Sequence, residues 1–312
     1  MKNSIRQIFK FLHILLVSII LIVLGSCYND DEKKTDKFLA YKTTIDSWQE
    51  SRVISLKKNW LSLAGLFKLK EGENSFGASN SNDIIFPCRN IPDHIGSFFL
   101  NNGVVRIKIN PDVEVLYNNE KVQEMDMIYD QGSEPTILQL GSLSWYIIKR
   151  LENIYVRLKD SHNPLIEEFK GISTYPLDTT WRINCQFEPH LTTKIIETTT
   201  TAGDPSRISS SGAVGFSING QYYRLDVWSL RDSGRFQTIF ADETSGIDTY
   251  GAGRFIIIER SQIDGRYVID FNKAYNPPCA FTEFATCPIP PPQNRLPIKI
   301  TAGEKKYHEE TH

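Results

Sequence analysis

The stretch SFFLNNGVVRIKI, residues 97–109, decides the fold class. Two short runs rich in apolar residues flank Asn102-Gly103. Asn-Gly between such runs predicts a type I′ turn, because both central residues of that turn need positive φ. The stretch therefore predicts an antiparallel β-hairpin.

The same pattern continues along the chain. Asn118-Asn119 follows VEVLY, and Asn219-Gly220 joins two further alternating runs. After residue 60, short apolar runs recur at intervals of roughly ten residues, which is typical of a sandwich or a partly closed barrel. Sustained helical spacing occurs only in residues 38–58. We therefore expect an all-β protein with a short N-terminal helix.

Polar residues 160–164 are the best candidate boundary between two halves. We expect a β-sandwich over residues 60–155 and a second β-rich half over residues 156–307, followed by a disordered tail, residues 308–312. Thr, Ser and Gly dominate residues 198–211, which predicts a long mobile loop beside the second half.

The N-terminus predicts export. A basic start precedes an apolar run over residues 11–24, and Leu24-Gly25-Ser26-Cys27 follows. This is the pattern of a secretory signal, and the run is shorter than the ~20 residues of a membrane span. Cysteine at the cleavage site resembles the lipobox of bacterial lipoproteins, which implies lipidation of Cys27. A short anchor helix is the alternative. We expect an outer-membrane lipoprotein of the cell envelope, held to the membrane through Cys27.

Residues 27–37 are polar and charged, which predicts a disordered tether. The acidic cluster at 30–32 resembles a surface-export signal of some Gram-negative lipoproteins, and a solvated spacer has the same composition. The formal net charge is −2, and it becomes −5 without residues 1–26, which hold three basic and no acidic residues. Because no block of basic residues stands out, we expect no nucleic-acid partner.

Four cysteines remain after Cys27, namely Cys88, Cys185, Cys279 and Cys287. An envelope compartment permits disulfides. Cys279 and Cys287 flank part of a proline-rich segment, and we expect them to form a disulfide that closes a small loop, with two free thiols as the alternative. For Cys88 and Cys185 the sequence supports no statement.

Familiar catalytic and cofactor motifs are weak. HEETH, residues 308–312, has the spacing of a zinc-protease motif, but it ends the chain and leaves no residue downstream for a third ligand. We therefore expect no metal. With no Walker A loop, no G-x-S-x-G and no paired C-x-x-C, we expect no cofactor. Cys279 could still meet His162 or His190 in space as a nucleophile pair.

Residues 69–87 resemble the opening of a forkhead-associated domain, a β-sandwich that binds phosphothreonine. In that family an arginine follows the glycine after the second strand, whereas Ala78 follows Gly77 here. His94 and Ser97 stand in the wrong order for the family's second motif. Without the guanidinium, a bidentate grip on phosphate is lost. We expect the sandwich but not phosphopeptide binding.

The second half gathers polar residues around the stiff segment 275–297. Proline lacks an N–H donor and fixes the backbone, so this segment suits a rigid pocket wall. Such a set could bind a carboxylate, a phosphate or a sugar. Alternatively, the arginines pair with aspartates to pin irregular backbone. The predicted ligand-binding residues are Asp242, Thr249, Tyr250, Arg254, Asp270, Asn272, Asn276, Asn294 and Arg295.

Four stretches resemble the bacterial family called domain of unknown function 1684. They are NWLSLAGLFKLKEGENSFG, DETSGIDTYGAGRF, DFNKAYNPPCAFTEFATCPIPPPQNRLP and IKITAGEKKY. The resemblance covers residues 39–307. It implies the architecture and the motif positions, but no reaction.

We expect a secreted lipoprotein that binds a small anionic or sugar-like molecule in a polar cleft of the C-terminal half. The alternative is a hydrolase using Asp242 or Asp270 as acid or base, or Cys279 as nucleophile. A protein-interaction scaffold is the second alternative.

Overall fold

The computed structural model describes residues 35–88, 90–131, 134–150, 152–230, 233–261 and 265–307. The predicted signal peptide, Cys27, most of the tether and the HEETH tail lie outside the described residues. Among the helices that are described, none is both long enough and apolar enough to cross a membrane.

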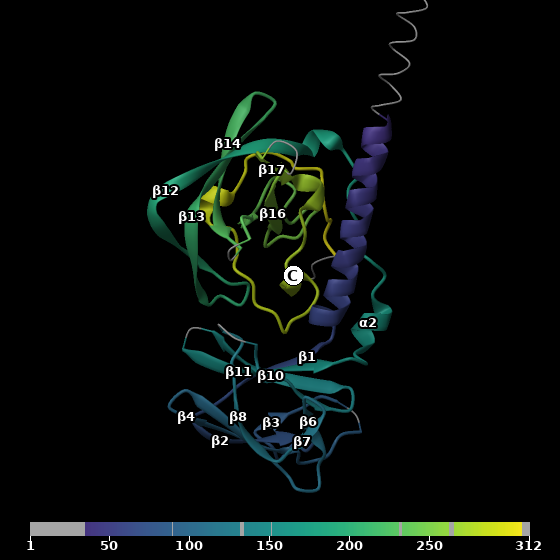
Figure 1. Cartoon of the computed structure of the whole chain (residues 1–312), viewed down its shortest axis with the longest axis vertical. Helices are drawn as coiled ribbons and strands as arrows, with labels where there is room; N and C mark the ends of the chain where they lie inside the picture. Colours follow the sequence, from purple (N-terminus) through teal and green to yellow (C-terminus); the bar gives the residue numbers. More distant parts are fainter. Residues whose placement is uncertain are drawn as a thin grey trace, which may run out of the picture.

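A helix opens the described chain and runs along the barrel half (Figure 1). It covers residues 35–56 and continues as a π-helical turn, η1 (Lys57–Leu61). Ile45 and Leu56 are its buried apolar side chains. The helix is the one expected from the spacing over residues 38–58.

Two sheets form the first half and pack around one core. The first has the order β1-β11-β10-β9-β6-β7, and the second β3-β2-β4-β5-β8. Phe76 lies at the centre of the core, with its ring centroid 4.4 Å from Phe98 and 5.7 Å from Trp145. The strands are β1 (Leu63–Lys68), β2 (Gly72–Gly77), β3 (Ile84–Ile85), β4 (Gly96–Asn101), β5 (Val104–Ile109), β6 (Val115–Tyr117), β7 (Glu120–Val122), β8 (Glu124–Met127), β9 (Leu138–Leu140), β10 (Leu143–Arg150) and β11 (Asn153–Asp160).

The predicted hairpin turns are present. Asn102 and Gly103, between β4 and β5, have φ of 49° and 81°. Asn118 and Asn119 join β6 to β7 with φ of 51° and 67°. These positive φ values place the turn residues in the left-handed region that Asn and Gly tolerate best.

A short connection links the halves. After β11, Asn163 caps α2 (Pro164–Glu168) by accepting a hydrogen bond from the Leu165 amide. Leu56, Leu61, Phe169 and Phe281 form a small separate core, which joins the N-terminal helix to this connection and to the proline-rich segment.

The second half is a closed barrel of six strands in the order β12-β13-β14-β15-β16-β17. Pairing of Arg182 with Asp270 closes it between β12 and β17. Its interior is apolar, with Phe216, Phe240 and Phe271 in one buried cluster. The strands are β12 (Arg182–Thr199), β13 (Pro205–Ile218), β14 (Gln221–Ser229), β15 (Phe236–Phe240), β16 (Arg254–Arg260) and β17 (Tyr267–Asp270).

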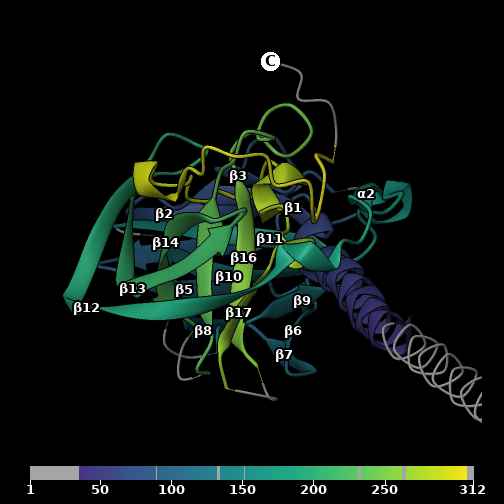
Figure 2. The same cartoon turned by 90° about the horizontal axis from the view of Figure 1, so that it is seen from above.

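Most of the stretch 198–211, predicted to be a mobile loop, belongs to a long hairpin, so that prediction was wrong. β12 and β13 pair as far as Thr199 and Pro205, and β12 curves around the barrel (Figures 1 and 2). Thr is a good strand former, and the hairpin tip pairs with the proline-rich segment through Thr200 and Pro288. The high content of Thr, Ser and Gly in this stretch does not by itself reveal these two causes of strand formation.

The all-β fold class with a short N-terminal helix is confirmed. The likeness of the first half to a forkhead-associated domain stays a prediction.

Candidate functional site

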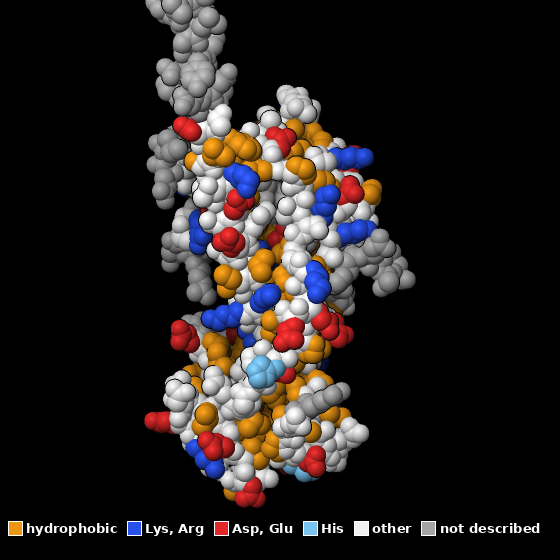
Figure 3. All heavy atoms as spheres, turned by 90° about the vertical axis from the view of Figure 1, so that its right-hand side faces the viewer, with side chains coloured by type: hydrophobic (Ala, Val, Ile, Leu, Met, Phe, Trp, Pro, Cys, Tyr) orange, Lys and Arg blue, Asp and Glu red, His pale blue; other side chains and the backbone are white. Residues whose placement is uncertain are grey.

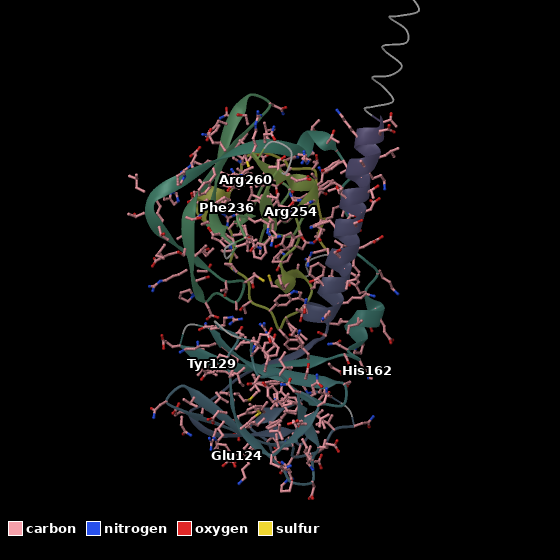
Figure 4. The ribbon with its side chains drawn as sticks, viewed as in Figure 1. Glu124, Tyr129, His162, Phe236, Arg254 and Arg260 are labelled. Carbon is pink, nitrogen blue, oxygen red and sulfur yellow. The ribbon has the colours of Figure 1, made fainter. Side chains whose placement is uncertain are left out.

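Arg254 lies inside the barrel half (Figure 4) and pins backbone. Its guanidinium donates to the carbonyls of Ile300 and Ala302, and its Nη2 lies 3.2 Å from Asp242 Oδ1. Both side chains have no exposed surface. Burial lowers the pKa of Arg254, and Asp242 opposes that shift. The pair therefore holds the irregular C-terminal segment around residues 300–304 in place.

The stretch around Asp242 is a self-contained turn. Asp242 Oδ2 accepts from Thr244 Oγ1 at 2.8 Å and from the Ile300 amide at 2.8 Å. Thr249 is buried, with its hydroxyl 2.9 Å from that of Thr244. Gly253 has a φ of +87°, and a Cβ atom at this position would lie only 2.4 Å from the Pro290 side chain. The Gly-x-Gly stretch thus permits close packing of protein on protein.

Asn294 also serves the fold. Its Nδ2 donates to the carbonyls of Asp226 and Ile239 and to Thr238 Oγ1, and its Oδ1 accepts from the Asp226 amide. Its neighbour Arg295 is exposed and pairs through its backbone with Ala241. The Asn294 side chain thus holds backbone in place, as Arg254 does.

Asn276 belongs to a buried network that reaches the N-terminal helix. Its amide donates to Glu304 Oε2 at 2.7 Å, and its carbonyl accepts from Arg52 at 2.7 Å. Arg52 also contacts Glu304 at 3.2 Å and lies 4.8 Å from the Tyr275 ring centroid. Burial raises the pKa of Glu304, while Arg52 and the Asn276 amide oppose the shift.

Glu304 and Arg52 also line a cavity of about 550 Å³ beside the helix, together with Asp46, Glu50 and Thr174. On the face that carries the helix, basic and acidic side chains are interspersed (Figure 3). Among the described lining residues, acidic side chains outnumber basic ones, so this cavity has no excess of positive charge that would attract an anion.

Asp270 and Asn272 lie together, and Tyr41 joins them. The Tyr41 hydroxyl donates to the Asp270 carboxylate at 2.9 Å and accepts from Asn272 Nδ2 at 3.0 Å. Asn272 also donates to the Asp178 carbonyl at 2.8 Å. Burial, followed by the Asp270 charge, raises the pKa of Tyr41. The cluster docks the helix onto the barrel.

Asp270 also lines a cleft of about 560 Å³, which we call the basic cleft. Ile257 and Val268 face it, whereas Ile256, Ile258 and Ile269 belong to the barrel core. Alternate strand residues share a face, so the basic cleft lies on the outer side of β16 and β17. Its charged lining residues are Arg182, Arg235, Arg260, Lys273, Glu259 and Asp270.

The basic cleft has a positive excess, with four basic and two acidic side chains among the described residues. Lys273 lies 3.6 Å from Glu259. Arg260 donates to the Gly265 carbonyl at 2.7 Å, which fixes its head group near the rim. Arg182 lies over the Tyr41 ring, 5.9 Å from its centroid. Arg182, Arg235 and Arg260 are exposed to solvent.

Tyr250 lies apart from the basic cleft, beside the cysteines of the proline-rich segment. Its hydroxyl donates to Cys279 Sγ at 3.7 Å. Cys279 and Cys287 are free thiols in the structure, and the thiol of Cys287 donates to Cys279. The predicted disulfide remains a prediction.

The nine predicted ligand residues thus belong to separate places, and Asp270 is the one that lines the basic cleft. Sequence reasoning missed Arg182, Arg235, Arg260 and Lys273 as a group. No local signal in the sequence groups these residues, because Arg182 lies next to Asp270 only through the pairing of β12 with β17. Glu304 and Arg52 were also missed as partners, although both lie within the stretch that resembles the family.

Residues 167–305 match a family model described as "Protein of unknown function (DUF1684)". No curated protein matches this chain. Among solved structures, the solution NMR structure of an uncharacterized protein of Haloarcula marismortui is 28% identical, with a TM-score of 0.37, over 47% of this chain and 80% of that chain. At that TM-score the likeness carries no argument about the fold. The family match therefore supports the resemblance to the DUF1684 family in the half of the chain that forms the barrel.

Proposed function

We propose that this protein is a lipoprotein of the cell envelope that binds a small anionic ligand in the basic cleft. The observation that carries the proposal is the excess of four basic over two acidic side chains in one cleft of about 560 Å³. Small-molecule sites in proteins have volumes of roughly 300–1,000 Å³. Guanidinium groups suit carboxylate and phosphate, because their planar forks match the oxygens of these anions.

Asp270 and its hydrogen-bond partners form a polar part of the basic cleft that can orient a bound ligand. The Asp270 carboxylate is held by Tyr41 and by the Asn272 amide. A ligand that presents an anionic group to the arginines and a hydroxyl to Asp270 would satisfy both. A phosphorylated or carboxylated sugar has this combination, which refines the anionic and sugar-like classes expected from the sequence.

The location that we propose, the cell envelope, depends on the predicted export and lipidation. The N-terminal pattern ending in Cys27 predicts them from the sequence. Within the hydrolase alternative, Asp242 has no support as acid or base, because its carboxylate has no exposed surface; Asp270 and Cys279 remain its candidates.

The test is a thermal-shift comparison of residues 28–312 with inorganic phosphate, citrate, glucose 6-phosphate and glucose. A ligand that binds only the folded state adds about 2.7 kcal/mol at a hundred times its dissociation constant. We expect glucose 6-phosphate or citrate to raise the melting temperature of the wild type but not of R235A/R260A. Arg207 is exposed on the β12–β13 hairpin, outside the basic cleft, so R207A is the matched control and should respond like the wild type. An equal response of R235A/R260A, or a response to glucose alone, would refute anion binding here.

A further inference from the structure

Two thiols of the proline-rich segment meet at a place outside the basic cleft. Cys279 lies in the 3₁₀ turn η4 (Pro278–Ala280) and is half-buried, whereas Cys287 is buried. Cys287 donates a hydrogen bond to the sulfur of Cys279. The more exposed thiol is therefore the one that accepts, and the buried thiol is its partner.

Backbone contacts hold Cys287 in this position. Its amide donates to Thr201 Oγ1 at 3.4 Å, and its carbonyl accepts from the Thr201 amide at 2.9 Å. The Ile289 amide donates to the Thr199 carbonyl at 2.8 Å. The tip of the β12–β13 hairpin thus fixes Cys287 from both sides.

Cys279 is fixed by its own turn and by a hydroxyl. The amides of Ala280 and Phe281 donate to the carbonyls of Pro277 and Pro278, both at 3.0 Å. The Tyr250 hydroxyl donates to the sulfur at 3.7 Å. Hydrogen-bond donors around a sulfur favour its thiolate.

The pKa values of the two thiols are shifted in opposite directions. The hydrogen bond from Cys287, with help from Tyr250 and Thr201, lowers the pKa of Cys279 to about 7 against the effect of burial. The same hydrogen bond, together with burial, raises the pKa of Cys287, and the charge of Arg157 opposes that rise. Burial raises the pKa of Cys88 to about 11 and that of Cys185 to about 12.

We propose that Cys279 and Cys287 form a thiol–disulfide exchange site for low-molecular-weight disulfides, in which Cys279 attacks and Cys287 resolves. The Cys279 thiolate attacks one sulfur of the small disulfide, forming a mixed disulfide and releasing one small thiolate. That thiolate takes the proton of Cys287, whose sulfur then attacks the sulfur of Cys279 and releases the second small molecule as a thiolate, which takes a proton from water. The two cysteines are oxidised to a disulfide, and the small disulfide is reduced to two thiols. The reverse steps run with a small thiol in excess.

The first experiment treats reduced residues 28–312, which lack Cys27, with glutathione disulfide and follows the intact mass. Wild type should form the internal Cys279–Cys287 disulfide with no bound glutathione. C287S should stop at a mixed disulfide with one glutathione on Cys279, because the resolving thiol is gone. C279S should react at least about tenfold more slowly than C287S, since burial raises the pKa values of Cys88 and Cys185 and Cys287 is buried. Mixed disulfides that form equally fast on C279S and C287S, or a lack of reaction in wild type, would overturn the proposal.

A second measurement needs no variant and therefore does not depend on how C279S folds. Folded wild type is alkylated with a limiting amount of iodoacetamide at pH 7 and mapped by peptide mass. Cys279 should be labelled at least about tenfold faster than Cys88 and Cys185. Preferential labelling of Cys88 or Cys185 would contradict the assignment of Cys279 as the attacking thiol.

Discussion

Arg254 Nη2 lies 3.2 Å from Asp242 Oδ1, and neither side chain has any exposed surface. The sequence favours a pocket for these charged residues, with backbone pinning as the alternative. The structure favours pinning for this pair, because the guanidinium also holds the carbonyls of Ile300 and Ala302. Polar residues close to a proline-rich segment can thus serve the fold, and the ligand site must be sought where charges face solvent.

R254A should destabilise the barrel half severely. Removing one partner of a buried ion pair typically costs about 3–5 kcal/mol, because the remaining charge is left unpaired. Urea unfolding of R254A and wild type measures the difference. Since Arg207 and Glu197 form an exposed pair, R207A should change the free energy of unfolding by less than about 1 kcal/mol. A loss below about 1 kcal/mol for R254A would show that the pair does not pin the C-terminal segment.

Glu304 should make stability depend on pH in a particular direction. Burial raises its pKa above the ordinary value of 4.5, so the folded state holds this proton more tightly than the unfolded state. The resulting stability is fully present below the unfolded pKa and is lost as pH rises through the folded pKa. The stability of wild type relative to E304Q should therefore be larger at pH 4 than at pH 8, in urea unfolding at both values. A relative stability that grows toward pH 8 would contradict the burial of this carboxylate.

Y41F should loosen the N-terminal helix from the barrel. The hydroxyl donates to Asp270 and accepts from Asn272, and hydrogen bonds to charged groups contribute about 1.5–3 kcal/mol. Because Tyr41 is half-buried, we expect a loss near the lower end of that range, with faster amide hydrogen exchange in residues 38–50. Unchanged exchange there would mean that the helix is held by its apolar contacts instead.

The reactivity of Cys279 should titrate near neutrality. Its pKa is about 7 because Cys287 donates to its sulfur, so its alkylation rate should rise with pH to a midpoint near that value. C287A removes the donor and should shift the midpoint upward, toward an ordinary cysteine. C287S keeps a donor and should shift it less. Iodoacetamide reactions quenched at set times and analysed by peptide mapping give the alkylation rate at each pH. Identical midpoints in C287A and wild type would exclude Cys287 as the cause of the lowered pKa of Cys279.

Local features of the fold could be read from the sequence because their causes are local. Positive φ at Asn102 and Gly103 follows from residue type, and so does the hairpin. The hairpin tip at Thr200 could not be foreseen, because it is held by Pro288. Likewise, the carbonyl of Ile300 that binds Arg254 lies 46 residues away in the sequence.

The candidate site was harder to predict for the same reason. Its residues come from both ends of the barrel sequence, and Arg182 meets Asp270 only through barrel closure. The sequence did identify Asp270 and its neighbour Asn272, whose spacing places them together. It could not tell which aspartate faces a cleft, because burial depends on the path of segments far along the chain.

Calorimetric titration with glucose 6-phosphate tests the central claim, that the basic cleft binds an anion, most directly. The proteins are residues 28–312 of wild type, R235E and R207E, at two salt concentrations. We predict binding to wild type and R207E that weakens as salt rises, and loss of binding in R235E, because the charge reversal places a carboxylate at the cleft. Equal affinity of R235E and R207E, or the absence of binding to wild type with glucose 6-phosphate, citrate and inorganic phosphate, would contradict the claim.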